Sequence, residues 1–243
     1  MRRLVDVAIS ASALILLFPL LVAIAVAIVI DSPGNPFYRA LRVGKDGRKF
    51  RMWKFRTMAT PGNAWQTGPG ITARGDSRIT RLGGLLRRSK LDELPQFFNV
   101  LIGQMTLVGP RPEAPEFVAF YGTRQLNVLR VKPGVTGVVQ IASAEESDSI
   151  PEGVRPDLYY VSNLMGPKLN MDLEYMETRT AWSDTRIVLA TAAMVFRVIF
   201  KTLFRAQPEQ DQAQDLEQNG DGGAMQVAAA EGASNDNLDR RSV

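Results

Sequence analysis

The segment Ser89-Lys90-Leu91-Asp92-Glu93-Leu94-Pro95-Gln96 is the part of the chain that best predicts both its fold and its chemistry. Ser89 and Asp92 are residue types that cap helix starts, Pro95 is tolerated in a first helical turn, and apolar residues follow it. A helix start favours bound phosphate and the ionised form of an aspartate. Neighbouring side chains on a helix point about 100° apart, so we expect Asp92 and Glu93 to have separate roles.

The chain contains no histidine and no cysteine. Imidazole acid–base catalysis, thiolate nucleophiles and His/Cys zinc sites are therefore excluded. Carboxylate and hydroxyl chemistry remain, with a hard cation such as magnesium (Mg2+). Asp92 is a candidate nucleophile toward phosphorus, Glu93 a candidate metal ligand, and Arg111, between two prolines, a candidate phosphate ligand. The alternative is that Asp92 caps a helix and Glu93 is an ordinary surface residue.

Val7–Ile30 is a run of 24 residues without a charge, and as a straight helix it would reach roughly 36 Å, enough to cross a bilayer. Pro19 lies near its middle, and basic residues flank both ends. A spanning helix would expose one basic group on the outer side, against the positive-inside tendency. We therefore expect a re-entrant helix-break-helix, bent at Pro19, that returns to the same membrane face. A kinked transmembrane helix is the alternative.

Two extended segments, 37–43 and 49–58, are predicted on either side of Gly44-Lys45-Asp46-Gly47, in which Asp-Gly indicates a tight turn. The second segment brings Lys54 and Arg56 close to the point where the chain leaves the membrane. An exposed basic strand is the alternative for these two residues. Residues 59–76 contain four glycines and two prolines and are predicted to form a mobile loop.

The segment 77–89 sets leucines and an isoleucine against arginines at helical spacing, which predicts a basic amphipathic helix at the membrane interface. Arg87 and Arg88 are near enough in sequence to Asp92 to reach a diphosphate or a lipid headgroup; a solvated basic face is the alternative. Basic residues also crowd 39–56, which fits an anionic lipid surface or a phosphorylated substrate. We expect no nucleic-acid partner, because no zinc-finger or RNP-type motif occurs and the chain begins with an apolar anchor.

The second half of the chain is less decisive. A helix is predicted over 113–129, then a turn and a buried strand over 132–141. The expected core residues of that helix are Phe117, Phe120, Tyr121 and Val128. Residues 182–204 are apolar but interrupted by basic residues, which predicts an amphipathic helix on the bilayer, with a helix docked on the core as the alternative. The polar composition from 206 onward predicts disorder.

Several motifs carry a family resemblance. They are Lys54-Phe55-Arg56-Thr57-Met58, the segment 89–96 followed by Asn99-Val100-Leu101 and Gly103, then 107–112, 132–137 and Asp157-Leu158-Tyr159-Tyr160. In this order and at this spacing, over about residues 1–200, they resemble the bacterial sugar transferase family, the monotopic phosphoglycosyltransferases. That resemblance implies transfer of a sugar phosphate from a UDP-sugar to polyprenyl (undecaprenyl) phosphate.

The resemblance also implies roles for particular residues. Asp92 is expected to attack the sugar-bearing phosphate and form a covalent aspartyl intermediate, with Glu93 holding Mg2+ while UMP leaves. Lys54 and Asp157 are expected in the site by the same resemblance. The residues expected to bind substrate or phosphate are Lys54, Arg56, Arg87, Arg88, Arg111 and Asp157.

Two positions depart from the family pattern. Phe18 precedes Pro19 where the family often has serine, and Ile141-Ala142-Ser143-Ala144-Glu145 stands where an Asn-Gly-Arg with a site arginine is usual. Arg155 is a candidate replacement for that arginine from another backbone position. These departures leave one alternative open, a catalytically inactive membrane-docked scaffold of the same fold.

The sequence as a whole predicts an α+β fold, mostly helical, with a re-entrant membrane hairpin and a small cytosolic catalytic domain carrying interfacial amphipathic helices. The expected boundaries are 1–36 for the hairpin, 37–180 for the catalytic domain, 181–205 for an interfacial helix and 206–243 for a disordered tail. The expected location is the cytosolic face of the bacterial inner membrane, with Asp92 at the lipid–water boundary beside a cationic pocket. A homo-oligomer remains open, and no motif identifies the sugar or the polysaccharide pathway.

Overall fold

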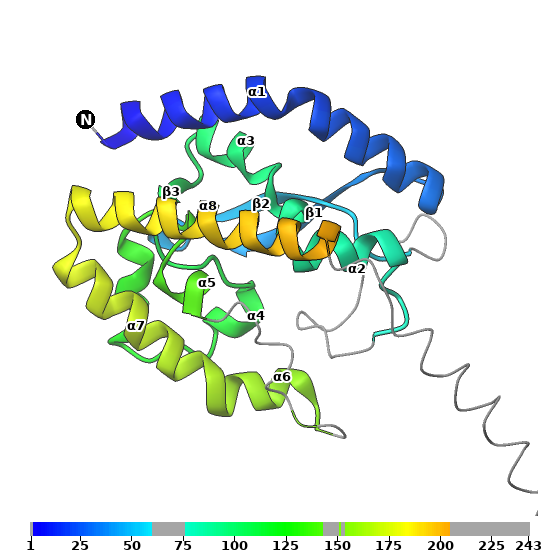
Figure 1. The fold of residues 1–243 in the computed structure, drawn as a ribbon. Helices are drawn as coiled ribbons and strands as arrows, with labels where there is room; N and C mark the ends of the chain where they lie inside the picture. Colours follow the sequence, from blue (N-terminus) through cyan, green and yellow to red (C-terminus); the bar gives the residue numbers. More distant parts are fainter. Residues whose placement is uncertain (1, 60–75, 143–150, 152–153, 205–243) are drawn as a thin grey trace, which may run out of the picture. The chain divides into compact units, whose positions relative to one another are not determined.

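The computed structural model of the protein describes residues 2–59, 76–142, 151 and 154–204 (Figure 1). Over these residues the fold combines helices with small sheets and is mostly helical, as predicted. Contacts divide the chain into one unit of residues 1–198 and a second from residue 199 onward, and the first unit contains the candidate site. Nearly all of the predicted loop at 59–76, and the predicted tail at 206–243, lie outside the described residues.

The helices of the described residues include two long ones, the first and the last in the sequence. They are α1 (Arg2–Asp31), α2 (Arg81–Arg88), α3 (Gln96–Leu101), α4 (Pro115–Val118), α5 (Val138–Ala142), α6 (Pro156–Tyr159), α7 (Met165–Thr178) and α8 (Ala181–Phe204). Short 3-10 turns are η1 (Lys45–Gly47), η2 (Leu91–Glu93) and η3 (Gln125–Arg130), and η5 (Tyr160–Leu164) is a π-helical turn between α6 and α7.

The predicted hairpin is confirmed. Strands β1 (Phe37–Val43) and β2 (Lys49–Phe55) pair in antiparallel register, with Phe37 opposite Phe55 and Val43 opposite Lys49. Asp46 and Gly47 in the connecting turn have φ angles of 55° and 73°, as the Asp-Gly signal predicts. One face of the hairpin packs Ala40, Phe50 and Met52 against residues of α3 and the loop after it, which fixes the position of β2 next to that helix.

Helix α1 is continuous through Pro19, and its ribbon changes direction part of the way along (Figure 1). Within the described residues it is the helix that is long and apolar enough to cross a membrane, judged by length and composition alone. Proline removes a backbone donor and crowds the preceding turn, so a bend is expected there. The re-entrant path of this helix remains a prediction.

Both ends of α1 contact the same globular body. Near its N-terminus, Arg3 donates a 2.8 Å hydrogen bond to the Leu101 carbonyl of α3, and Asp6 accepts a 2.6 Å bond from the Thr106 hydroxyl of β3 (Thr106–Val108). Near its C-terminus, Ile24 and Ile28 are buried against residues of β2 and α2. The body therefore holds the two ends of α1, while its middle presents apolar side chains such as Ile15, Leu16 and Phe18 to the outside.

Helix α2 is shorter than the predicted segment 77–89. Thr80 caps it by accepting a 2.9 Å hydrogen bond from the backbone N–H of Gly83. Gly83 is required by a close approach, because a Cβ atom there would lie 2.0 Å from the carbonyl oxygen of Thr57. The helix thus packs directly on the chain that follows β2, and its C-terminal end leads into the Asp92–Glu93 segment.

Several predictions for the second half are wrong. The helix expected at 113–129 is instead α4 and η3 separated by an irregular segment, because Gly122 interrupts the helical run and Pro115 starts it late. Phe117 and Val128 are buried as predicted, but Phe120 is 63% exposed. The strand expected at 132–141 is only β4 (Gly134–Thr136), which pairs in parallel with β3 and gives way to α5.

Candidate active site

Asp92 and Glu93 lie in the 3-10 turn η2, between α2 and α3. The predicted helix start at Asp92 is wrong: α3 begins after Pro95, and no side chain caps it. Ser89 instead ends α2, and its hydroxyl donates to the Leu85 carbonyl at 2.8 Å. Burial and the surrounding charged side chains account for the pKa shifts of the two carboxylates.

Among the described residues, Lys54 forms ion pairs with both carboxylates. Its Nζ lies 2.7 Å from Glu93 Oε1 and 3.8 Å from Asp92 Oδ2. The three side chains are 17%, 15% and 10% exposed, in the order Lys54, Glu93 and Asp92. A largely buried group of one ammonium and two carboxylates carries a net negative charge, and further cations are needed to balance it.

Asn99 holds the strand that carries Lys54 against the helix that follows the carboxylates. Its amide oxygen accepts a 2.9 Å hydrogen bond from the Trp53 N–H, and its amide nitrogen donates to the Arg51 carbonyl at 2.9 Å. Asn99 is fully buried in α3, so these bonds are shielded from water. Sequence reasoning noted Asn99 only as part of a motif, and its bridging role depends on a contact between residues far apart in the chain.

The two carboxylates have opposite pKa shifts. Burial raises the pKa of Asp92 above its usual 3.8, against the opposing effect of Lys54. Burial also favours the neutral form of Glu93, but Lys54, Arg111 and Lys90 outweigh it and lower the pKa of Glu93 to about 2. The ion pair therefore fixes Glu93 as a carboxylate and leaves Asp92 the more basic of the two, which agrees with the expectation that they have separate roles.

Three further cations approach this pair. Burial alone would lower the pKa of Arg111, but the negative charges of Glu93 and Glu113 raise it above its usual value. Lys90 is half-buried next to the pair, and burial lowers its pKa. Arg87 donates a 2.8 Å hydrogen bond to the Thr57 hydroxyl. Burial lowers the pKa of Arg87, and the negative charge of Asp92 partly opposes this change. The predicted cationic surroundings of Asp92 are present, and Lys90 is a member that the sequence prediction did not include.

Other predicted site residues lie in different surroundings. Arg56 is buried and binds the segment that follows α1, with hydrogen bonds to Ser32 and a 3.0 Å bond to the Pro33 carbonyl. Arg88 is exposed on α2. Asp157 forms a 2.6 Å ion pair with Arg155, which lowers the pKa of Asp157 and raises that of its partner. Phosphate contacts by these residues stay predictions, and the region after Ala142 that lacks the family arginine lies outside the described residues.

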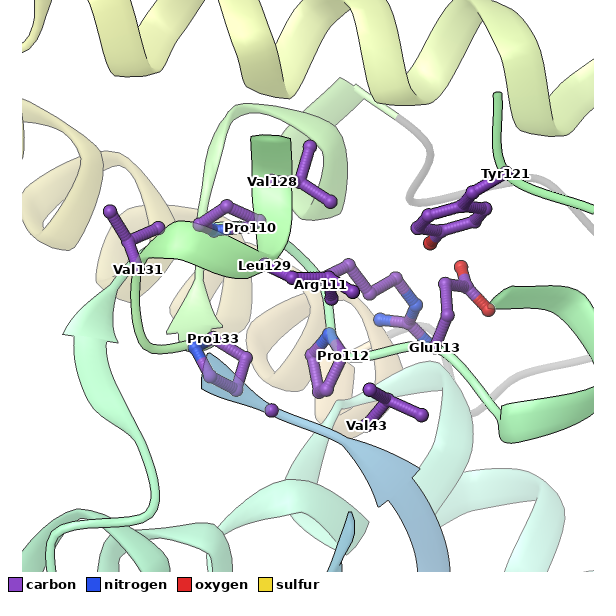
Figure 2. Close-up of a pocket in the computed structure, with 11 residues that line it drawn as sticks. Val43, Pro110, Arg111, Pro112, Glu113, Tyr121, Val128, Leu129, Val131 and Pro133 are labelled. Atoms are coloured by element: carbon purple, nitrogen blue, oxygen red, sulfur yellow. The ribbon is translucent and has the colours of Figure 1, made fainter. Parts of the chain in front are cut away.

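A second polar cluster adjoins Arg111. Figure 2 shows the Arg111 side chain extending toward the Glu113 carboxylate, with the Tyr121 hydroxyl facing the same group. Tyr160 also donates a hydrogen bond to Glu113. Burial and Glu113 raise the pKa of both tyrosines. Glu113 thus neutralises part of the Arg111 charge and helps to hold it near the carboxylate pair.

Asp172 on α7 is a buried acid near Arg111 that was not among the predicted site residues. Its Oδ2 accepts a 3.3 Å hydrogen bond from the Arg111 N–H, and burial raises its pKa to about 7. The signal was present, because Asp172-Leu173-Glu174-Tyr175 repeats the Asp-Leu-x-Tyr spacing that drew attention to Asp157. Of these two runs, the one at 172 begins with an acid buried beside Arg111.

The acidic residues of the site show how well it could hold a Mg2+ ion. Among the described residues, no group of three or more Asp, Glu, His or Cys side chains is placed to bind a metal ion. Mg2+ is usually held by one or two carboxylates together with substrate phosphates and water. Asp92 and Glu93 fit that pattern only when a phosphorylated substrate supplies further oxygens, so Mg2+ remains a proposal.

Comparisons with known proteins agree on one family. The model of the bacterial sugar transferase family matches residues 1–198. A Xanthomonas campestris pv. campestris protein named UDP-glucose:undecaprenyl-phosphate glucose-1-phosphate transferase is 40% identical over 197 residues, which are 80% of this chain and 38% of that protein. An Escherichia coli (strain K12) protein of the same name is 38% identical over 79% of this chain and 39% of its own length.

A third relative is closer in length. The exopolysaccharide production protein PSS of Rhizobium leguminosarum bv. phaseoli is 37% identical, and the match covers 67% of this chain and 86% of that protein. Against the Xanthomonas and Escherichia proteins, by contrast, the chain spans about two fifths of the relative. Because the family model covers nearly all of the part that the structure describes, the chain belongs to the bacterial sugar transferase family.

Proposed function

We propose that the protein transfers a sugar phosphate from a UDP-sugar to undecaprenyl phosphate, or another polyprenyl phosphate, giving a polyprenyl-diphosphate-sugar and UMP. The names of its relatives, which include UDP-glucose and UDP-N-acetylgalactosamine enzymes, support this class of reaction. The main supporting observation is the buried Asp92–Glu93 pair beside Lys54. A carboxylate among cations suits attack on a phosphorus atom whose oxygens are negatively charged.

In the proposed first step, an Asp92 carboxylate oxygen attacks the sugar-bearing phosphorus of the UDP-sugar. The bond from that phosphorus to the bridging oxygen breaks, UMP leaves with the electron pair, and the sugar phosphate stays on Asp92 as an acyl phosphate. In the second step, a phosphate oxygen of the polyprenyl phosphate attacks the same phosphorus and releases the Asp92 carboxylate. Two successive displacements at one carboxylate predict ping-pong kinetics.

The pKa values support this division of roles. Its raised pKa makes Asp92 a better nucleophile when ionised, and Lys54 at 3.8 Å favours that ionised form. Glu93 stays ionised because its pKa is about 2. When bound, Mg2+ would supply positive charge to the diphosphate, and Glu93 is the residue proposed to hold it. Arg111 and Arg87 are proposed to bind the phosphate oxygens.

We further propose that α1 enters one leaflet and returns to the cytosolic face of the inner membrane. Arg3 and Asp6 at its start and Ile24 and Ile28 near its end all contact the same body. A helix whose ends are both bound to one globular unit is hard to reconcile with ends on opposite sides of a bilayer roughly 30 Å thick. Exposed apolar residues on α8, such as Trp182 and Leu189, fit an interfacial position.

A labelling experiment tests the covalent step. Detergent-solubilised full-length protein is mixed with Mg2+ and UDP-sugars that carry a radiolabel on the sugar-bearing phosphate, without a lipid acceptor. Wild-type protein should become labelled and release UMP, and the label should leave when polyprenyl phosphate is added. Asp92→Asn should remain unlabelled, whereas the control Asp46→Asn, which changes an exposed turn residue, should label normally. Labelling of Asp92→Asn would refute the role of this residue, and no UMP release with any donor would favour the inactive scaffold.

A further inference from the structure

Lys90 has an unusual backbone for a residue with a side chain. Its φ and ψ angles are 58° and 13°, in the left-handed region, and among the described residues only Asp46 is also a non-glycine residue with positive φ. Glycine is the usual residue where a helix ends in this conformation, because a Cβ atom there is strained. Strained backbone of this kind is concentrated at functional sites, where it positions particular groups.

The strained residue directly precedes η2, the 3-10 turn that contains Asp92 and Glu93. The Lys90 N–H donates to the Arg87 carbonyl at 3.2 Å and closes α2, while the Lys90 carbonyl accepts the Glu93 N–H at 3.2 Å and opens η2. The left-handed residue therefore turns the chain from the helix into the segment with Asp92 and Glu93. A glycine would make the same turn without strain, so the turn alone does not explain a lysine here.

The side chain of Lys90 also differs from that of Lys54. Lys54 is already bound, at 2.7 Å, by Glu93. Within the part of the chain that the structure describes, the Lys90 ammonium group forms no ion pair and no hydrogen bond. Lys90 is nevertheless half-buried, and its ammonium group is near enough to feel the negative charges of Glu93 and Asp92. Removing a cation from water without a close partner is unfavourable, and an anion arriving beside the carboxylates would supply that partner.

We propose that Lys90 is a phosphate-binding residue of the site, held in the left-handed conformation so that its ammonium group meets a substrate phosphate next to Asp92. This inference deepens the proposed function and depends on it for the identity of the phosphate. The chemistry fits two sources, the diphosphate of the donor and the phosphate of the polyprenyl acceptor. A lysine that is not already neutralised by a close carboxylate can add its whole charge to that contact.

Lys90→Gly tests the proposal because stability and binding should change in opposite directions. Loss of the strained Cβ should raise Tm by about 2–4 °C. Loss of the ammonium group should weaken phosphate binding about tenfold to a hundredfold. Lys90→Arg keeps the charge and should bind within about threefold of wild type, because a guanidinium also pairs with phosphate. Asp46→Gly is the matched control: it relieves the same kind of strain in an exposed turn and should raise Tm without changing binding.

Binding is measured by calorimetry on full-length protein in detergent micelles, with UDP and with a short-chain polyprenyl phosphate as separate ligands. Weaker binding of UDP alone assigns Lys90 to the donor, and weaker binding of the lipid alone assigns it to the acceptor. Unchanged binding of both ligands by Lys90→Gly overturns the proposal, as does a lower Tm accompanying weaker binding, which indicates a structural role. No binding of either ligand by wild type also overturns it.

The same measurements separate this inference from the proposed function. If wild-type protein binds UDP but turns over no UDP-sugar, the proposed transfer reaction fails, and the binding data for Lys90→Gly still decide the role of Lys90. If wild type is active and Lys90→Gly binds and reacts normally, the reaction stands and the role of Lys90 fails.

Discussion

Lys54→Met removes the ammonium group that lies 2.7 Å from Glu93 Oε1 and 3.8 Å from Asp92 Oδ2. In the folded protein the pKa of Glu93 is lowered from 4.5 to about 2, in spite of burial and chiefly by Lys54, with Arg111 and Lys90 adding to it. That difference corresponds to about 3 kcal/mol of folding free energy at neutral pH. Because the other two cations remain, we expect Lys54→Met to lose about 2–3 kcal/mol, which lowers Tm by roughly 5–10 °C.

The pH dependence has a definite sign. A carboxylate whose pKa is lower in the folded state than in the unfolded state contributes its stability above the unfolded pKa, here 4.5. The contribution is lost as the pH falls through about 2. The difference in Tm between wild type and Lys54→Met should therefore be largest above about pH 5 and should narrow at lower pH.

The assay is thermal unfolding of detergent-solubilised protein followed by circular dichroism between about pH 3 and pH 7.5. Lys49→Met is the matched control, because Lys49 is an exposed lysine on the same strand, and it should change Tm little. The double variant Lys54→Met with Glu93→Gln should recover part of the loss, because the Glu93 carboxylate, which loses its closest cation in the single variant, is then replaced by a neutral amide. The recovery should be partial, because Asp92 still lacks Lys54. An equal Tm for Lys54→Met and wild type at pH 7, or a gap that stays constant to pH 3, would refute the ion-pair reasoning.

Two further predictions concern packing and titration. Gly83→Ala should destabilise the fold by at least about 2 kcal/mol, because its Cβ would lie 2.0 Å from the Thr57 carbonyl oxygen, whereas Gly84→Ala, with its nearest contact at 3.9 Å, should stabilise by about 0.5–1 kcal/mol in chemical denaturation. Asp172 has a pKa of about 7 in the fold instead of 3.8, so the folded state binds its proton more tightly and stability should fall as pH rises from about 4 to 7. Asp172→Asn should reduce this pH-dependent loss of unfolding free energy by about 2–4 kcal/mol, while Asp157→Asn should leave it unchanged. If the Tm of Asp172→Asn changes with pH in parallel with that of wild type, the raised pKa of Asp172 is contradicted.

Local sequence patterns predicted the secondary structure well in segments where all residues favoured the same structure. The Asp-Gly turn between two predicted extended segments correctly located the β1–β2 hairpin. The long apolar run and the interrupted apolar run at 182–204 both became helices, α1 and α8. Where signals competed, the predictions were wrong: a helix predicted over 113–129 was interrupted by glycine and started late at a proline, and the last part of the strand predicted over 132–141 became helix α5. Tertiary packing overrides weak local preferences in such segments.

The available chemistry follows from composition, because a chain without histidine or cysteine leaves carboxylates and cations as its reactive groups, and the Asp92–Glu93 segment could be singled out from its local pattern. The cations that surround these two carboxylates could be identified from the folded chain alone. Lys54 reaches Glu93 across 39 positions of sequence, and a hydrogen bond from the Arg111 backbone N–H to Asp172, 61 positions away, helps to place Arg111. Such partners are chosen by how the hairpin, α3 and α7 pack, and side-chain charge depends on distance and burial, neither of which a linear pattern contains.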